Sequence, residues 1–479
     1  MKLSLSFSDV IIIFLYYILI AIIGIYGGKS KIKEGKEKTL DFLLAGRKLT
    51  LPLFVASLVA TWYGNILGIG EFVHRYGLVA WFCFGIVYYV TALFYALFVS
   101  NKIRNISSQT IPELLELKYG KVASVYSSLV MLLITFPSVY VLMVGVFINL
   151  IFGLSLLPSI ILGTILTFIY IGYGGYKSNV ITNTIQFILM YFGFGIFTFF
   201  ALKEISFDLG QLNYLPKSHL KFFGEVSWQY IITWLFISLQ TFIDPSFFQR
   251  CASVNSEKTA KKGILISITF WFIFDTMTIF TGLVGKLKFP EINPLFSYPI
   301  LLENIVPSFF KGIVLVSMLA TIVSTLESYS FLSALIIGKN IMEKFRTLIK
   351  LRIENRVRIG LVISAFFSIF LAYFIPSAID IIYKTSSIAV PSLFYPTITG
   401  LFSNKTFSKT KVNSLIISSS LVTFIFVIVK EFSISFIQNP IIKFFVSFEP
   451  MVFGFVWSTI FFIYILLTEK RKITATTQA

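Results

Sequence analysis

The chain has few charged residues, few cysteines and few histidines for its length. Charged side chains make up 13% of its 479 residues, with only two Cys and two His. Cys83 and Cys251 lie far apart without a pairing pattern, so neither a disulfide framework nor a metal site is indicated, and two histidines do not make a His-rich site. The sequence contains no HExxH motif, phosphate-binding loop or nucleophile–base set, and it therefore does not indicate an enzyme.

Apolar residues are abundant instead, at 56% of the chain. Apolar runs of about 20 residues, long enough to cross a hydrocarbon layer roughly 30 Å thick, recur from end to end. They are continuous rather than alternating, which excludes a transmembrane barrel. We therefore predict an all-α polytopic membrane protein that forms a single transmembrane domain over residues 1–479, with about 13 spans. The expected spans are 8–28, 51–73, 78–100, 122–148, 156–174, 178–202, 226–248, 263–285, 309–338, 359–377, 382–402, 412–430 and 448–468.

The net charge of +18 follows the predicted topology. When the spans are threaded with the N-terminus outside, most of the 40 Lys and Arg residues fall on the cytoplasmic side. This is the positive-inside distribution, and it predicts a multi-pass protein of the cytoplasmic membrane with its C-terminus in the cytoplasm. The basic charge is then explained by topology and anionic lipid rather than by nucleic acid. The lipid bilayer is an expected partner, and no obligate protein partner is evident.

Two of the expected spans are interrupted in composition. Gly64, Asn65 and Gly68 crowd the middle of the span 51–73, and Asp244 precedes Pro245 near the end of the span 226–248. Such residues favour a helix break that lines a cavity over a continuous helix that faces lipid. Because the breaks lie five spans apart, we expect two five-helix repeats, 51–202 and 226–402. The helix 8–28 and the helices in 412–468 would be additions to these repeats.

A polar stripe runs along one apolar span. Thr321, Ser324, Thr325 and Ser328 follow spacings of three and four residues, so they share one helical face. Aligned hydroxyls at membrane depth either join neighbouring helices or form the oxygen wall of an ion path. The residues alone leave both interpretations open.

An ordered set of motifs over roughly residues 8–400 resembles the sodium/solute symporter family, which includes sodium–sugar, sodium–proline and sodium–pantothenate carriers. The resemblance rests on Asp41-Phe-Leu-Leu-Ala-Gly-Arg-Lys48, Ser57-Leu-Val-Ala-Thr61, Arg75-Tyr-Gly77, Thr110-Ile-Pro-Glu113, Lys118-Tyr-Gly120, Tyr173-Gly-Gly175, Thr182-Asn-Thr-Ile-Gln186, Gln249-Arg250 and Ser324-Thr-Leu-Glu-Ser328. It implies an inverted-repeat fold of the leucine-transporter type and alternating access.

The resemblance also implies one sodium site between the broken span 51–73 and the span 309–338. Backbone carbonyls would come from Ala60, Tyr63 and Thr321, and hydroxyl oxygens from Ser324 and Thr325. Independently, a small hard cation prefers oxygen ligands, and a broken helix releases carbonyls that an intact one would use. Sodium is therefore the expected co-transported ion.

Residues near the two breaks are the candidates for solute binding: Trp62, Asn65, Leu67, Trp234 and Asp244. Leu67 stands where sugar carriers of the family have Gln, and Trp62 stands where proline carriers have Asp. Neither substrate class is therefore predicted. An Asp244 that lines the site would favour a solute with an amine or several hydrogen-bond donors.

Other polar residues depart from the family pattern or carry charge into the spans. Asn183 replaces an acidic residue that is common in the family and lies near the ion site. Glu327 is turned away from the face of Ser324, so Glu327 and Asn183 are expected to support the site or act as a gate. Glu71 is four residues before Arg75 and should pair with it. Asp275 is expected to bond to another helix.

These features together predict a secondary active transporter for sodium-coupled symport of a small polar organic solute. Asn183 and the spare carboxylates keep a proton-coupled or uncoupled carrier of the same fold as an alternative. A membrane sensor that uses the fold as an input module is a further alternative.

Overall fold

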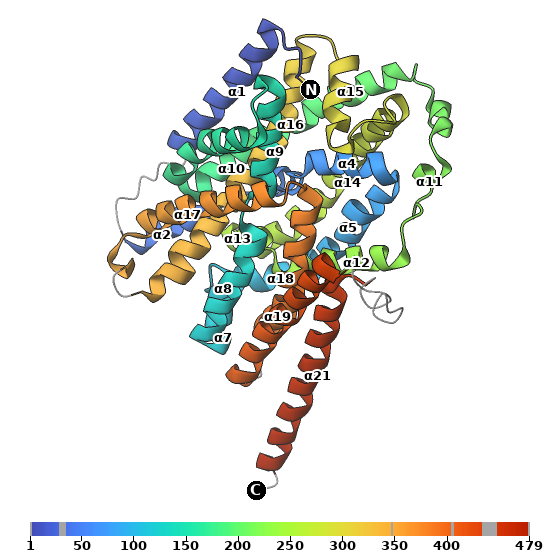
Figure 1. Cartoon of the computed structure of the whole chain (residues 1–479). Coiled ribbons are helices and arrows are strands. Elements are labelled where there is room, and N and C mark those ends of the chain that lie inside the picture. The colour runs from blue at the N-terminus through green and yellow to red at the C-terminus, as the bar shows by residue number, and fades with distance from the viewer. Residues whose placement is uncertain (1, 28–34, 346–347, 404–406, 434–447, 478–479) are drawn as a thin grey trace.

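The computed structural model describes residues 2–27, 35–345, 348–403, 407–433 and 448–477, and nearly all regular structure in these ranges is helical (Figure 1). The first half contains α1 (Phe7–Tyr26), α2 (Lys36–Leu44), α3 (Leu51–Trp62), α4 (Ile66–Tyr76), α5 (Val87–Phe94), α6 (Ser100–Asn105), α7 (Ile111–Tyr119), α8 (Lys121–Thr135), α9 (Ser138–Phe152) and α10 (Leu156–Glu204). The second half contains α11 (Lys217–Leu220), α12 (Trp228–Ser238), α13 (Pro245–Ser253), α14 (Glu257–Lys288), α15 (Ser297–Ile305), α16 (Phe310–Leu335), α17 (Ile353–Phe374), α18 (Ala378–Phe402), α19 (Lys409–Ser433) and α21 (Pro450–Thr477).

The structure confirms a polytopic helical protein but not the count of 13 spans. In the described residues, 10 helical segments are long and apolar enough to cross a membrane, or 11 if α3 and α4 form one bent span. The expected spans 156–174 and 178–202 fall within α10, where Gly175 adopts a non-helical conformation with φ 64. The expected span 382–402 lies in α18, which is not among the 10. Glycine suits position 175 because it adopts a positive φ without a steric clash.

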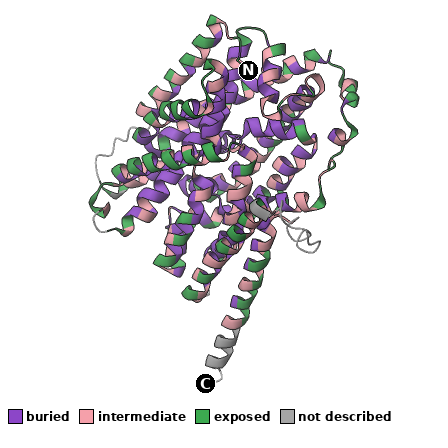
Figure 2. Cartoon of the chain, in the orientation of Figure 1, coloured by how far each residue is buried: buried purple, intermediate pink, exposed green. Residues whose placement is uncertain are grey.

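The core of the bundle is built around α16. Its apolar window is 89% buried, whereas that of α21 at the C-terminal end is 22% buried. Exposed Phe, Leu and Ile side chains gather on α1, α17, α19 and α21, which is the pattern expected of helices that face lipid (Figure 2). Because α16 is enclosed on nearly every side, its polar residues contact other helices rather than the surroundings.

Both interrupted spans are broken in the structure. The helix α3 ends at Trp62, and α4 resumes at Ile66 after a bend of 53°. Between α12 and α13 the chain passes through a 3₁₀ turn, and Asp244 then begins α13. The Asp244 Oδ1 accepts hydrogen bonds from the backbone N–H groups of Ser246 (2.7 Å) and Phe247 (3.1 Å), which is an N-cap.

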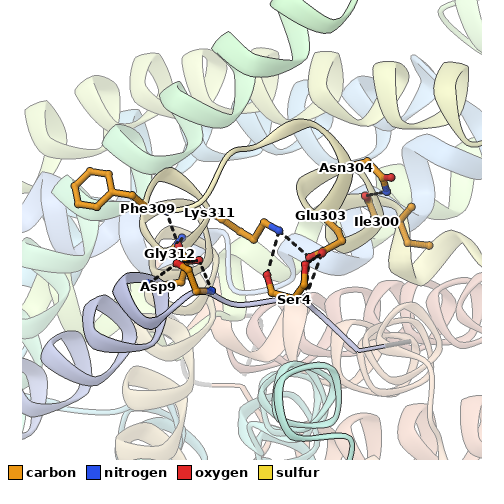
Figure 3. A network of polar contacts seen from close by, with 9 residues as sticks. Ser4, Asp9, Ile300, Glu303, Asn304, Phe309, Lys311 and Gly312 are labelled. Carbon is orange, nitrogen blue, oxygen red and sulfur yellow. Dashed lines mark hydrogen bonds and ion pairs between the residues drawn. The ribbon is translucent and has the colours of Figure 1, made fainter.

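The N-terminal segment holds the start of α16 (Figure 3). The Asp9 carboxylate of α1 accepts a hydrogen bond from the Gly312 backbone N–H at 2.7 Å, and so occupies the positive end of α16. Beside it, the Lys311 ammonium contacts Glu303 of α15 at 3.1 Å and donates to the Ser4 carbonyl at 3.2 Å. These contacts fix α1 and α15 to one end of the helix that carries the polar stripe.

Candidate ion and solute site

Two hydroxyls of α16 contact the broken end of α3. The Ser324 Oγ donates to the Ala60 carbonyl at 2.8 Å, and the Thr325 Oγ1 donates to the Thr61 carbonyl at 2.9 Å. These carbonyls are available because α3 ends at Trp62 and supplies no further helical N–H donors to them. The helix break and the polar stripe therefore meet as one cluster of oxygen atoms.

The remaining predicted sodium ligands are close to this cluster. The Thr321 carbonyl accepts hydrogen bonds from Ser324 (2.9 Å) and Thr325 (3.4 Å), while the Thr321 hydroxyl donates back to the Ser317 carbonyl. The Thr321 carbonyl thus lies beside both hydroxyls, and its role as a sodium ligand stays a prediction. Tyr63 immediately follows α3 at the break, and its hydroxyl points away to the Trp271 carbonyl of α14 at 2.7 Å.

The contact between the break and α16 depends on Gly64. A Cβ added at this position would lie 2.4 Å from both the Cβ and the Oγ1 of Thr325. Real Cβ atoms do not approach other atoms so closely, and any side chain would therefore force the break away from α16. Glycine at this position allows the carbonyls to reach the hydroxyls.

A second polar network lies directly behind the ion cluster. The Asn183 amide is 3.1 Å from the Thr61 hydroxyl and 3.0 Å from the Ser328 hydroxyl, in either orientation of the amide. The Arg250 guanidinium donates to the same Thr61 hydroxyl at 2.5 Å and to the Ser57 carbonyl at 3.0 Å. Ser328 therefore belongs to this network and not to the predicted ligand set.

The position of Arg250 corrects one expectation. The expected span 226–248 ends before Arg250, but in the structure the helical segment continues through α13 to Ser253, and Arg250 and Cys251 are fully buried. Neutral oxygens of α3 and α13 satisfy the guanidinium, and no ion pair of Arg250 occurs among the described residues. The oxygens on α3 are distant in sequence, so the sequence around Arg250 does not indicate its burial.

Glu327 lies on another side of α16 from the ion cluster. Its carboxylate accepts hydrogen bonds from Tyr170 (2.5 Å), Thr182 (2.6 Å) and Gln186 (3.2 Å), all on α10. A carboxylate with three donors is well satisfied and joins α16 firmly to α10. This geometry agrees with an expected supporting role and places Glu327 outside direct contact with the ion cluster.

A cavity of about 120 Å³ with a largely aromatic and apolar wall adjoins the break. Four of the five candidate solute-binding residues line it: Trp62, Asn65, Trp234 and Asp244. Leu67 is fully buried and does not line the cavity. It lies two positions after Asn65 and therefore points to a different side of α4. Other lining residues are Tyr63, Tyr88, Tyr140, Gln240, Thr241, Asp275, Tyr329 and Ser386.

Asp275 is a lining residue that sequence reasoning did not select. It lies on α14, is 2% exposed, and accepts a hydrogen bond from the Tyr89 hydroxyl on a neighbouring helix. The expected bond to another helix is thus confirmed. The signal that could have identified its place in the cavity was its lack of a cationic partner within the span.

A larger vestibule of about 490 Å³ lies beyond the cavity. Three ion pairs line it: Glu71–Arg75 at 2.7 Å, as expected from their spacing, Lys384–Glu431 at 2.7 Å and Lys430–Glu449 at 2.5 Å. Its wall is therefore polar and charged, in contrast to the aromatic wall of the inner cavity.

Aromatic rings lie between the linings of the two spaces. Tyr230 and Tyr383 line the vestibule and stack at 6.3 Å between ring centroids, and Trp234 of the inner cavity packs edge-on against both rings. These three side chains therefore join the wall of the vestibule to the wall of the inner cavity.

The bundle contains two broken helices, an oxygen cluster at one break and a cavity beside it. This is the architecture of a secondary transporter. The comparison with known families agrees, because the pattern of the Sodium:solute symporter family matches residues 42–418. The chain belongs to the sodium:solute symporter family.

Individual relatives are distant. The chain is 26% identical to the high-affinity choline transporter 1 of Drosophila melanogaster over 284 residues, which are 55% of this chain and 42% of that protein. It is 23% identical to the sodium/glucose cotransporter 1 of Ovis aries over 402 residues, 71% of this chain and 58% of that one. The chain thus spans about half the length of these curated relatives.

Among solved structures, a sodium-coupled sialic acid symporter in a substrate-bound outward-open state is similar, with a TM-score of 0.78 and 15% sequence identity. The match covers 96% of this chain and 97% of that one. At this identity the likeness establishes the fold, which is of the leucine-transporter type. It does not carry the solute of that protein to this chain.

Proposed function

We propose that the protein is a sodium-coupled symporter that carries a small polar organic solute across the cytoplasmic membrane by alternating access. The observation that carries this proposal is the contact of Ser324 and Thr325 with the carbonyls of Ala60 and Thr61. Neutral hydroxyls and carbonyls around a helix break suit a small monovalent cation. The Thr321 and Tyr63 carbonyls would complete the ligand set.

Coupling follows from where the ion would bind. Sodium at this cluster would hold α3 to α16, because its ligands come from both helices. The same break continues into Trp62 and Asn65, which line the solute cavity. An ion that fixes the break would preorganise the cavity and shift the population toward the state that binds solute. Separation of α3 from α16 would release both ligands.

The proposed orientation has the N-terminus outside and the C-terminus in the cytoplasm, as the distribution of Lys and Arg favours. The vestibule would then face outside. We further propose that residues 51–202 and 226–402 are the two inverted repeats. The breaks after Trp62 and before Asp244 support this division, because they interrupt corresponding spans.

The direct test is sodium binding to the purified full chain in detergent, measured with radiolabelled sodium, for the wild type and a Ser324→Ala/Thr325→Ala variant. We expect saturable binding in the wild type and its loss in the variant. Ser330→Ala is the matched control, because Ser330 lies on the same helix and its buried hydroxyl has no hydrogen-bond partner. Equal sodium binding by all three proteins would refute the proposed site.

Transport is tested in proteoliposomes with a panel of radiolabelled amines, sugars, carboxylates and vitamins. Uptake that requires an inward sodium gradient would support symport. Uptake that does not depend on the sodium gradient but depends steeply on pH would instead support a proton-coupled carrier. Arg250 near the ion cluster is the observation that favours this second candidate, because a buried cation without an ion pair opposes sodium.

A further inference from the structure

The inner cavity is lined by acidic side chains and by no basic ones. Two carboxylates, Asp244 and Asp275, line it, and the lining includes no Lys, Arg or His. Neither carboxylate has an ion pair in the part of the chain that the structure describes, and both are at least 94% buried. Buried carboxylates are costly without a cationic partner. The cavity is therefore suited to a positively charged occupant.

The two carboxylates differ in their hydrogen-bond partners. The Asp244 Oδ1 caps α13, and its Oδ2 accepts the Tyr329 hydroxyl at 2.6 Å. Asp275 accepts a hydrogen bond from the Tyr89 hydroxyl at Oδ2, and the Tyr63 hydroxyl also interacts with its carboxylate. The partners of Asp275 among the described residues are thus side-chain hydroxyls, which can share the carboxylate with a ligand, whereas Asp244 is committed to backbone groups of the helix break.

The remaining wall fits an organic cation better than a bare metal ion. Trp62, Tyr88, Tyr140 and Trp234 line the cavity, and Trp62 packs edge-on against Tyr88 at 5.0 Å between centroids. Aromatic faces attract amines and quaternary ammonium groups, while sodium requires a shell of oxygen ligands. Such an oxygen shell is present at Ser324 and Thr325 instead, which gives the two cations separate places.

Unpartnered polar atoms in the cavity wall indicate a second group on the ligand. In the described part of the chain, neither the nitrogen nor the oxygen of the buried Asn65 amide has a hydrogen-bond partner, and the buried indole N–H of Trp234 has none besides the nearby Tyr230 hydroxyl. Asn65 is 8% exposed and Trp234 is 1% exposed. Buried polar groups without partners are uncommon, so a ligand hydroxyl or carbonyl that satisfies them would bind favourably. The cavity volume of about 120 Å³ limits the ligand to a small molecule.

On the basis of the proposed symport function, we propose that the solute is a small organic cation with a hydroxyl or carbonyl group, whose amine or quaternary ammonium is held by Asp275 and the surrounding aromatic rings. Trp234 and Asn65 would bind the polar group. The inference assigns Asp275 as the residue that determines charge specificity, and it leaves Asp244 as the cap of α13.

Charge specificity is tested on the wild-type chain with matched probes. Binding of choline, of ethanolamine and of 3,3-dimethyl-1-butanol, the neutral carbon isostere of choline, is measured by thermal stabilisation of the purified protein in sodium buffer. We expect at least one cation to stabilise the protein and the isostere to have no effect. Choline alone would identify a quaternary ammonium site, and ethanolamine alone an amine site. Equal stabilisation by choline and its isostere, or stabilisation by neither cation, would overturn the inference.

The residue assignment is tested with Asp275→Asn, which preserves size. Loss of one partner from a buried charge pair should weaken cation binding by a factor of about 100 or more. Asp244→Asn is the comparison, and we expect it to lower the thermal stability of the unliganded protein and to weaken cation binding less than Asp275→Asn does. The opposite ranking of the two variants in cation affinity would contradict the assignment of Asp275.

Radiolabelled sodium binding separates this inference from the proposed function. If the wild-type protein binds sodium but neither choline nor ethanolamine, the cationic solute is refuted and the symport proposal stands. A wild-type protein that binds choline or ethanolamine but not sodium would refute the coupling and leave the cationic solute intact. Retained sodium binding in Asp275→Asn would also show that the variant is folded.

Discussion

Replacement of Asn183 by Asp is expected to tighten sodium binding. The Asn183 side chain lies within hydrogen-bond distance of the Thr61 hydroxyl and, in the flipped amide, is 3.3 Å from the Ser324 carbonyl. An ion held by the Ser324 hydroxyl would therefore lie on the order of 7 Å from a carboxylate at position 183, which corresponds to about 2 kcal/mol of attraction at an effective dielectric constant near 20. Alone, this gain would tighten binding roughly tenfold to a hundredfold.

Arg250 reduces that gain. Its guanidinium contacts the same Thr61 hydroxyl as Asn183, so a carboxylate at position 183 would also pair with Arg250. The carboxylate would then offset the field of the buried guanidinium, which itself opposes a cation at the cluster. We therefore expect the lower end of the range, about a tenfold decrease in the dissociation constant of sodium.

The assay is a titration of radiolabelled sodium against the wild type and Asn183→Asp in detergent, with Asn179→Asp as the matched control on the same helix. Asn179 contacts Ser328 rather than Thr61, so its effect should be smaller. Unchanged or weaker sodium binding in Asn183→Asp, at wild-type thermal stability, would refute the electrostatic argument.

Three further substitutions test other parts of the structure. Gly64→Ala should weaken sodium binding more than tenfold because its Cβ would overlap Thr325, and an unchanged dissociation constant would contradict this. Glu327→Gln should lower the free energy of unfolding by about 1–3 kcal/mol, measured by chemical denaturation, because it replaces one of the two oxygens that accept these three hydrogen bonds by an NH₂ donor. Burial raises the pKa of Glu116, but the hydrogen bonds from Lys344 and Ser124 and the charges of Lys344 and Lys121 together outweigh burial, and the pKa lies below its ordinary value. The stabilisation by Glu116 should be present at neutral pH, be lost as the pH falls through the depressed pKa, and be absent from Glu116→Gln at every pH in thermal unfolding scans.

The break and the oxygen cluster could be predicted from sequence because both depend on local patterns. Glycines at 64 and 68 weaken one helix, and the spacing of Ser324 and Thr325 fixes a shared face of another. The resemblance to the family then placed these elements together. The ion cluster is therefore the part of the candidate site that sequence reasoning reached most directly, although the ligand roles themselves stay predictions.

The burial of Arg250 and the position of Asp275 could not be predicted in the same way. The partners of Arg250 on α3, Ser57 and Thr61, lie about 190 residues away, and nothing near Arg250 in the sequence indicates them. Asp275 lines the cavity only because α14 packs beside the break, which is a tertiary contact. The span count differed for another reason: Gly175 turns the chain inside α10 without a polar loop, so hydropathy does not mark the boundary.

The contacts of the N-terminal segment bear on which helices of the bundle can move together. Asp9 binds the start of α16, Gln186 of α10 contacts Tyr16 of α1 at 3.2 Å, and Glu327 joins α16 to α10. The three helices are thus cross-linked at the start of α16 and again around Glu327, and they should move as one frame against which α3 and α4 shift. The cap at Gly312 lies about 18 Å along the helix from Ser324. Spin labels on α1 and α16 should accordingly keep a constant separation when sodium is added. A substitution of Asp9 should tilt the frame and alter the affinity for sodium, although Asp9 is not one of the expected ligands.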